Sequence, residues 1–178
     1  MINHRTLAAL QRLVWALLHR ASALALPVSN EQLERIARLQ GAVIKESPSL
    51  TSLHGCLSAT SDGLVIRVNP RLSPAERRYA IAHEIGHTLI DHDIPLLRTR
   101  LTARLERPLE VSARVREQLC DWIAAELLVP QPVLAAEMTF HASPEFAIEK
   151  LASEFGTVES GMLLQFQMSG RMQRQLAW

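Results

Sequence analysis

The stretch AIAHEIGHTLIDHD, residues 80–93, carries two histidines four positions apart, with a glutamate beside the first. Four residues advance an α-helix by about 40° in azimuth, so His83 and His87 can reach one ion from the same face. Glu84 lies next to that face, where a general base can act on a water molecule without displacing it from the ion. The spacing therefore predicts a metal site, and zinc is the ion that this pattern of donors favours.

The third ligand has two candidates. His92 is near in sequence, but it lies five residues after His87 and about 140° round the helix. Glu117 and Asp121 are four apart in the expected helix REQLCDWIAAELLVP, so they share one face. Glu117 can ligate zinc, and Asp121 can accept a hydrogen bond from the outer nitrogen of a ligating histidine. We expect Glu117 to be the ligand, and we expect Glu126, which points elsewhere, to belong to a solvated acidic face.

Signals before the motif predict helices followed by short strands. Residues 5–24 have apolar side chains at helical spacing, and Ser29 opens a second helix with a capping box. The β-prone runs GAVIKESP, LHGCLSAT and GLVIRVNP follow, and a turn near 61–63 joins the last two as a hairpin. Ser73 then begins the motif helix with another capping box.

Helical patterns also dominate after the motif. A long helix is predicted over about 110–129, and further helical segments follow it. Helices around a small cluster of strands indicate an α+β fold. We expect a domain over 1–130, with N-terminal helices at 1–41, and a separate C-terminal helical part over 131–178.

The composition identifies no partner. The 178 residues have a net charge of +1, and their two cysteines are too few for a disulfide framework. His19 and Arg20 interrupt the N-terminal apolar run, which does not suit a signal peptide, and no apolar segment is long enough to cross a membrane. We therefore expect a cytoplasmic protein that does not act on a membrane.

These features together resemble the ImmA/IrrE family of metallo-endopeptidases. The resemblance rests on HEIGH preceded by ERRYAIA, on a hairpin ending in VIRVNP and on E-x-x-C-D-W-I-A-A-E-L-L-V-P, and it covers roughly residues 27–170. It implies a compact zincin-like fold in which the two motif histidines and Glu117 hold zinc, with Glu84 as the catalytic acid and base. Asp121 stands where the family has Asn or Asp.

The resemblance also implies a substrate. Members of the family typically cleave a separate helix-turn-helix repressor in response to stress, phage or mobile-element signals. We expect an endopeptidase that cleaves such a repressor in trans and so induces a stress, phage, mobile-element or defence operon. The alternative is a zinc-stabilised module that binds and sequesters a repressor without cleaving it. LASEFGTVESGMLLQF, residues 151–166, resembles the family's helix-turn-helix-like C-terminal part, but residues 151–170 contain no Arg or Lys, which favours a structural or docking role over DNA binding.

Further side chains are candidates for roles at the site. Cys56 is expected on an edge strand beside the cleft, where it could be a fourth zinc ligand or a redox switch, with an ordinary free cysteine as the alternative. Cys120 is expected in the core. The second stabiliser of the oxyanion stays open among Tyr79, His92 and His141, although core packing is the favoured role of Tyr79.

A basic connection joins the motif helix to the acidic helix. Between residues 95 and 116 it contains six arginines and two glutamates. A solvated surface loop is the simplest interpretation. The alternative is a regulatory contact with a nucleic acid such as single-stranded DNA, or with an acidic surface of the repressor. The residues proposed for this contact are Arg98, Arg100, Arg104 and Arg107.

Overall fold

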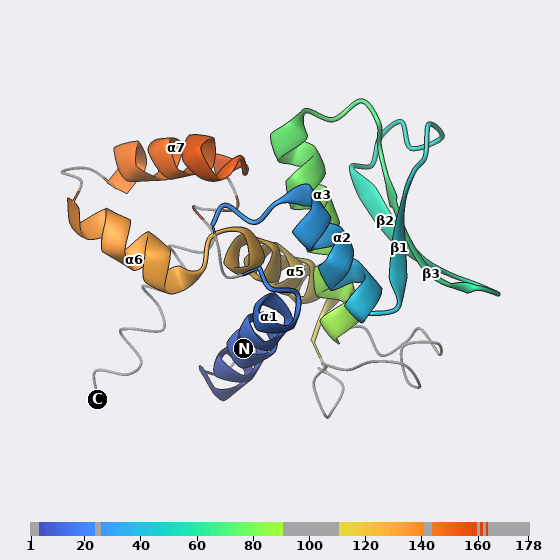
Figure 1. Ribbon diagram of the computed structural model, residues 1–178, viewed down its shortest axis with the longest axis horizontal. Helices are drawn as coiled ribbons and strands as arrows, with labels where there is room; N and C mark the ends of the chain where they lie inside the picture. The colour runs from blue at the N-terminus through green and yellow to red at the C-terminus, as the bar shows by residue number, and fades with distance from the viewer. Residues whose placement is uncertain are drawn as a thin grey trace.

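The computed structural model describes residues 4–23, 26–90, 111–140 and 144–159, together with Gly161 and Leu163. Its fold is α+β, as predicted, and is compatible with a compact zincin-like domain (Figure 1). The helices are α1 (His4–Arg20), α2 (Asn30–Leu39), α3 (Pro74–Ile90), α5 (Ala113–Leu128), α6 (Gln131–Phe140) and α7 (Pro144–Phe155), and the strands are β1 (Ala42–Glu46), β2 (Gly55–Thr60) and β3 (Gly63–Val68). The division at residue 130 and the helix-turn-helix character of the C-terminal part stay predictions.

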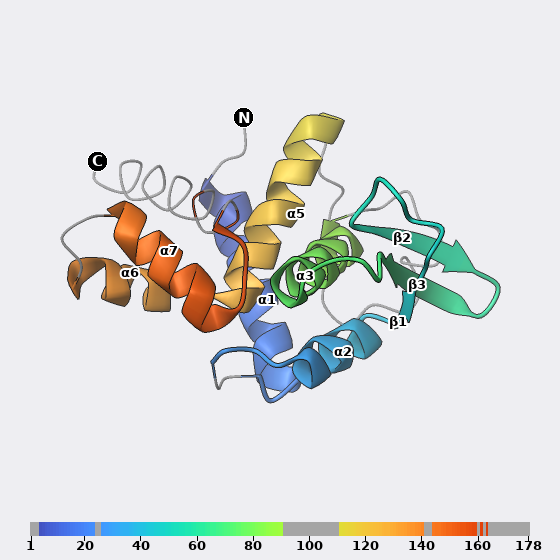
Figure 2. The same cartoon turned by 90° about the horizontal axis from the view of Figure 1, so that it is seen from above.

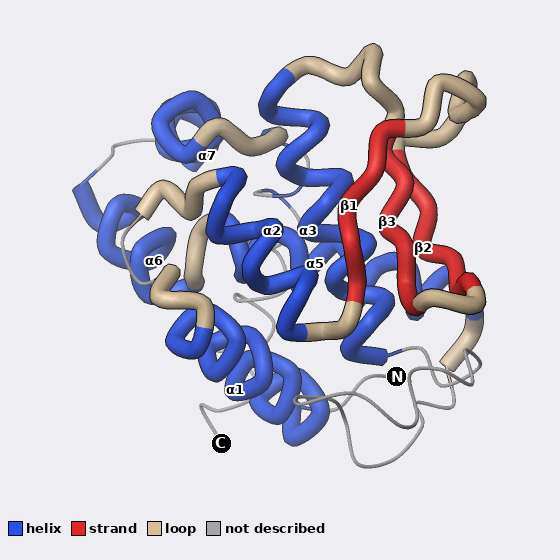
Figure 3. The backbone as a smooth tube through the Cα atoms, turned by 45° about the vertical axis from the view of Figure 1, so that its right-hand side comes forward, coloured by secondary structure: helices blue, strands red, loops and turns tan. Residues whose placement is uncertain are grey.

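The three strands form one mixed sheet in the order β1-β3-β2 (Figure 3). Strand β3 pairs in parallel with β1 and antiparallel with β2, and the β2–β3 hairpin confirms the expected turn. The central strand is a nearly continuous apolar run, with Leu64, Ile66 and Val68 on one face and Val65 on the other, all at 6% exposure or less, which suits a strand covered on both faces. Within the described residues no strand pairs with the outer side of β2, so β2 is an edge strand of this sheet.

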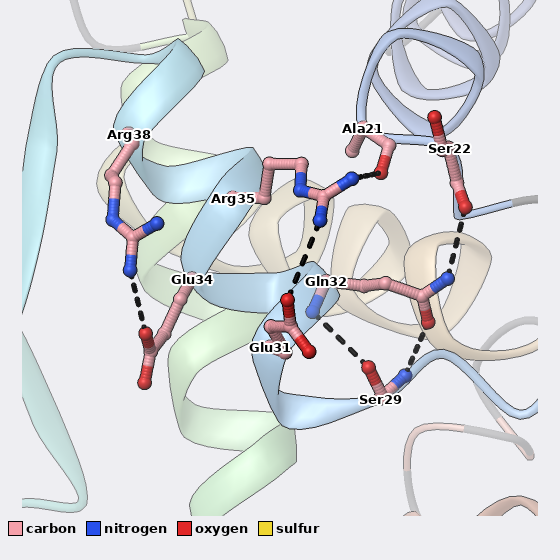
Figure 4. Close-up of polar contacts among 8 residues, drawn as sticks. All are labelled: Ala21, Ser22, Ser29, Glu31, Gln32, Glu34, Arg35 and Arg38. Atoms are coloured by element: carbon pink, nitrogen blue, oxygen red, sulfur yellow. Dashed lines mark hydrogen bonds and ion pairs between the residues drawn. The ribbon is translucent and has the colours of Figure 1, made fainter.

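Local capping sets where α2 begins. Ser29 accepts a hydrogen bond from the backbone of Gln32, whose side chain in turn accepts one from the Ser29 backbone (Figure 4). The Gln32 amide also donates to the Ser22 carbonyl, which ties the end of α1 to the start of α2. The helix ends before Gly41, whose φ of +69° turns the chain into β1. A second capping box, at Ser73, begins α3 as expected.

Helices α3 and α5 lie against each other at the centre of the molecule, with α3 between α5 and the sheet (Figure 2). Ile85 and Leu89 bury one face of α3. Gly86 allows the close approach to α5, since a Cβ there would lie 3.0 Å from Cα and 3.2 Å from the carbonyl oxygen of Cys120. The motif histidines are therefore held close to the turn of α5 that carries the predicted acidic residues.

The expectation that Glu126 is solvated is wrong, because α1 covers this side of α5 (Figure 1). Glu126 is fully buried, and its carboxylate accepts hydrogen bonds from Trp15 Nε1 (2.9 Å) and Gln11 Nε2 (3.1 Å) of α1. It also accepts one from the backbone nitrogen of Gln131 (3.0 Å), the first residue of α6. These hydrogen bonds offset the cost of burying the carboxylate.

None of the helices in the described ranges has the length and apolarity that crossing a membrane requires.

Candidate metal centre

The two motif histidines of α3 face a carboxylate of α5. Glu117 Oε2 lies 3.2 Å from Nε2 of His83 and 3.7 Å from Nε2 of His87. Donors bound at about 2.0–2.1 Å to one tetrahedral zinc ion lie roughly 3.3–3.4 Å from one another. The three side chains therefore converge with a spacing and a donor chemistry that fit a metal ion.

Asp121 orients the first histidine. Its Oδ1 lies 2.8 Å from Nδ1 of His83, as sequence analysis expected, so that Nδ1 carries the proton and Nε2 is left facing Glu117. Burial by itself lowers the pKa of His83, but the hydrogen bond and charge of Asp121, together with the charges of Glu84 and Glu117, raise the pKa of this imidazole above its usual value. Asp121 thus selects the tautomer that a metal at Nε2 requires.

Glu84 is covered by the start of β2. It is 7% exposed, and the backbone of Leu57 donates a hydrogen bond to its carboxylate. Burial raises the pKa of Glu84, although the nearby His87 and His83 partly offset that effect. Gly55 permits the close cover, since a Cβ there would lie 3.1 Å from Glu84 Cγ and 3.2 Å from its Oε1. A carboxyl group with a raised pKa suits proton transfer in both directions.

A cavity of about 450 Å³ opens between β2, α3 and α5. Glu84 and both motif histidines line it, so the predicted base and the predicted ligands share one chamber. His54 also lines the cavity; its place two residues before Cys56, on the same strand face, was the signal that could have singled it out. The complete lining is Leu53, His54, Gly55, Cys56, Leu57, Tyr79, Ala80, His83, Glu84, His87, Glu117 and Asp121.

The two cysteines lie where the sequence placed them, Cys56 beside the cavity and Cys120 in the core, but the buried thiol also lies near the motif histidines. Cys56 lines the cavity, whereas the thiol of the fully buried Cys120 belongs with His83 and His87 to a group of donor atoms within 4.8 Å of one another. The Glu117 oxygen, at 3.2 and 3.7 Å from the two imidazoles, fits the spacing expected of a third donor on one ion. The role of Cys56 stays a prediction.

Tyr79, a candidate for stabilising the oxyanion, has another contact. Its hydroxyl lies 3.2 Å from Asp121 Oδ1 and 3.4 Å from the Asp121 carbonyl oxygen, to either of which it can donate. Burial, reinforced by the charge of Asp121, raises the pKa of the phenol, so it stays a neutral donor. The candidates His92 and His141 lie outside the described residues, as do the four arginines 98, 100, 104 and 107.

An H-E-x-x-H helix that faces an acidic helix beside a small sheet is typical of metal-dependent peptidases. The chain belongs to the family of the IrrE N-terminal-like domain, a peptidase family whose model matches residues 37–160. The chain is also similar to the radiation response metalloprotease IrrE of Deinococcus radiodurans, with 35% identity over 88 residues. That alignment covers 49% of this chain and 26% of the relative, so the chain spans about a quarter of the protein it matches. The family implies a metal, and the donor set fits one.

Proposed function

We propose that this protein is a zinc-dependent endopeptidase of the gluzincin-like H-E-x-x-H…E type. The observation that carries the proposal is the approach of one Glu117 oxygen to both motif histidines, beside a buried Glu84 in the same cavity. Two imidazoles and one carboxylate are a donor set found in catalytic zinc sites, where a fourth position is left for water or substrate. His83, His87 and Glu117 would hold the ion.

Glu84 would move the protons of the reaction. When bound, zinc supplies a water of lowered pKa and a polarised substrate carbonyl. The Glu84 carboxylate would accept the proton of the attacking water and deliver it to the leaving amine. Its burial and its raised pKa support this double role. The Leu57 backbone N–H limits how far the carboxylate can turn.

An extended peptide segment is the class of substrate that the cavity favours. The cavity lies along β2, an edge strand of the sheet, and is lined by residues 53–57 at its start. An edge strand offers unpaired backbone groups with which an extended peptide can pair. Leu53, at 55% exposure, adds an apolar contact at the mouth of the cavity.

We propose a helix-turn-helix repressor as the substrate, cleaved in trans in the cytoplasm to induce a stress, phage, mobile-element or defence operon. The family membership supports this proposal, as does the radiation response in the name of the similar metalloprotease. Single-stranded DNA is the proposed activator, with the arginines at 98, 100, 104 and 107 as its contact.

Glu84→Gln tests the proposal in the zinc-loaded protein incubated with the repressor encoded beside it. Because the change removes the base and keeps the ligands, we expect cleavage to fall by about 10²–10⁴-fold while zinc binding stays within about twofold. A chelator should abolish cleavage by the unaltered protein. If Glu84→Gln still relieves repression fully, the protein sequesters the repressor and the peptidase proposal is wrong.

A further inference from the structure

We propose that Tyr79 is a positioning residue for His83, and that the C-terminal segment at Gly161 holds Tyr79 in that role. This inference rests on the metal-binding part of the proposed function and goes beyond it. It connects the site to Gly161, which follows His83 by 78 residues and Asp121 by 40 and is not among the residues that line the cavity.

The first observation is a chain of hydrogen bonds through one oxygen atom. Asp121 Oδ1 lies 3.2 Å from the Tyr79 hydroxyl and 2.8 Å from Nδ1 of His83. The Asp121 side chain keeps 36% of its exposure, so the contact with His83 alone leaves room for rotation toward solvent. A second donor on the same oxygen restricts that rotation, and partners of this kind set the orientation of a metal-ligating imidazole.

The second observation is the contact that holds the tyrosine ring. Gly161 is buried, and a Cβ at this position would overlap Tyr79 Cε2, far inside 3.0 Å, and would lie 3.0 Å from Cζ and 3.1 Å from the hydroxyl oxygen. Real Cβ atoms are almost never found closer than 3.0 Å, so any side chain at 161 would require the ring to move. The absence of a side chain at 161 therefore lets the hydroxyl reach Asp121.

The neighbouring residue fastens the same segment to α3. The Arg78 guanidinium donates to the carbonyl of Phe155 at 3.3 Å, at the last residue of α7, and it also contacts the Val28 carbonyl. A guanidinium that donates to a terminal carbonyl stabilises the end of a helix. Arg78 and Tyr79, adjacent on α3, thus dock the chain between 155 and 161 against the helix that carries the motif.

It follows that the C-terminal segment and the metal site are energetically coupled. A partner that displaced the segment around Gly161 would release Tyr79, free the Asp121 carboxylate and weaken the orientation of His83. By reciprocity, a bound metal would favour the docked position of the segment. The coupling passes from Gly161 to Tyr79, from Tyr79 to Asp121 and from Asp121 to His83, and it needs no change of fold.

Tyr79→Phe removes the hydroxyl and keeps the ring. In the full chain, titrated with zinc against a chromophoric chelator, we expect its zinc affinity to fall by about 3- to 10-fold, which is less than the 10–100-fold typical of a partner that touches the ligand itself. The matched control is Trp15→Phe, which removes an aromatic donor from a different carboxylate of α5, Glu126, and should leave zinc affinity unchanged. An unchanged affinity in Tyr79→Phe would overturn the proposal.

Gly161→Ala tests the remote end of the coupling. It should lower zinc affinity about as much as Tyr79→Phe, and the double variant should be no worse than either single variant, because both changes interrupt one chain of contacts. Losses that multiply in the double variant would show independent effects and would contradict the role of Gly161.

A measurement on the metal-free protein separates this inference from the proposed peptidase. Nitrogen NMR of the His83 ring should show that Tyr79→Phe and Gly161→Ala reduce the population protonated at Nδ1, whereas Trp15→Phe does not. Unaltered ring signals in both variants would refute the positioning role. Failure of the protein to cleave any repressor would overturn the peptidase proposal and leave this readout unaffected.

Discussion

Helix α5 carries two carboxylates that accept hydrogen bonds from aromatic side chains of other helices, and the two carboxylates have different roles. Asp121, toward the cavity, is bonded to Tyr79 and to a titratable imidazole and is partly exposed. Glu126, five residues later, is fully buried and receives neutral donors from Trp15, Gln11 and a backbone N–H. The same chemical group thus orients the site at one position and joins three helices at the other.

The two carboxylates differ in the chemistry of their hydrogen-bond partners. Asp121 shares its charge with His83, so its contribution depends on protons and on a bound metal. The three hydrogen bonds described for Glu126 come from an indole, an amide and a backbone N–H, which do not titrate in the usual pH range, and we expect them to contribute to stability. Exposure and the type of partner, rather than acidity of the residue, therefore separate the functional carboxylate from the structural one.

The largest effect on stability is expected for Glu126→Ala. The change leaves the Trp15 N–H and the Gln131 N–H without their acceptor and takes one of two side-chain acceptors from the Gln11 amide, and we expect the free energy of unfolding to fall by about 3 kcal/mol. Chemical denaturation checks this loss, while zinc affinity of the folded fraction should stay within about twofold. If Glu126→Ala instead lowered zinc affinity and left the free energy of unfolding unchanged, the structural role assigned to Glu126 would be wrong.

Asp121→Ala should have the opposite profile. Without its hydrogen bond, His83 loses the preference for the Nδ1 proton, and zinc affinity should fall by about 10–100-fold. The loss of stability in the metal-free protein should be smaller than that of Glu126→Ala, because Asp121 is partly exposed. The chelator titration and the denaturation curve, measured on Asp121→Ala and Glu126→Ala, separate the effect on zinc affinity from the effect on stability. Equal losses of stability in the two variants would contradict the different roles assigned to the two carboxylates.

A smaller effect is expected from pH in the metal-free protein. Because the folded pKa of His83 is raised, its pairing with Asp121 stabilises the fold fully below the unfolded pKa of histidine, about 6.5, and that stabilisation is lost as pH rises through the folded pKa. The difference in melting temperature between the unaltered protein and Asp121→Asn should thus shrink from pH 6 to pH 9. A difference that grew with pH would contradict the pairing.

The smallest change is expected for Trp15→Phe. It removes one of three donors to Glu126 and keeps the packing of α1, so the free energy of unfolding should fall by about 1 kcal/mol. Thermal melting of the purified variant checks this value. A loss of stability as large as that of Glu126→Ala would mean that the indole N–H alone accounts for the stabilisation by Glu126.

The local parts of this structure could be predicted from sequence. The capping boxes at Ser29 and Ser73, the hairpin and the i, i+4 pairs depend on residues within one or two turns of each other, and the structure has them. Glu117 and Asp121 could be proposed for the histidines because a second periodic pair matched the first and because the family resemblance supported it.

Contacts between distant segments could not be predicted in this way. The burial of Glu126 depends on α1 crossing α5, and the approach of Gly161 to Tyr79 depends on how α7 returns to α3. The position of Cys120 beside the histidines follows from the tight packing at Gly86. Each is a property of tertiary packing, which periodicity within a helix does not record.

We propose above all that His83, His87 and Glu117 hold the metal, and for this test we take Cys56 as an ordinary free cysteine and Cys120 as a core residue. X-ray absorption spectroscopy of the zinc-loaded protein tests it most directly. The account predicts a first shell of nitrogen and oxygen alone at about 2.0–2.1 Å, which loses one oxygen in Glu117→Ala and is unchanged in Cys56→Ser and Cys120→Ala. A sulfur neighbour at about 2.3 Å in the unaltered protein would contradict it.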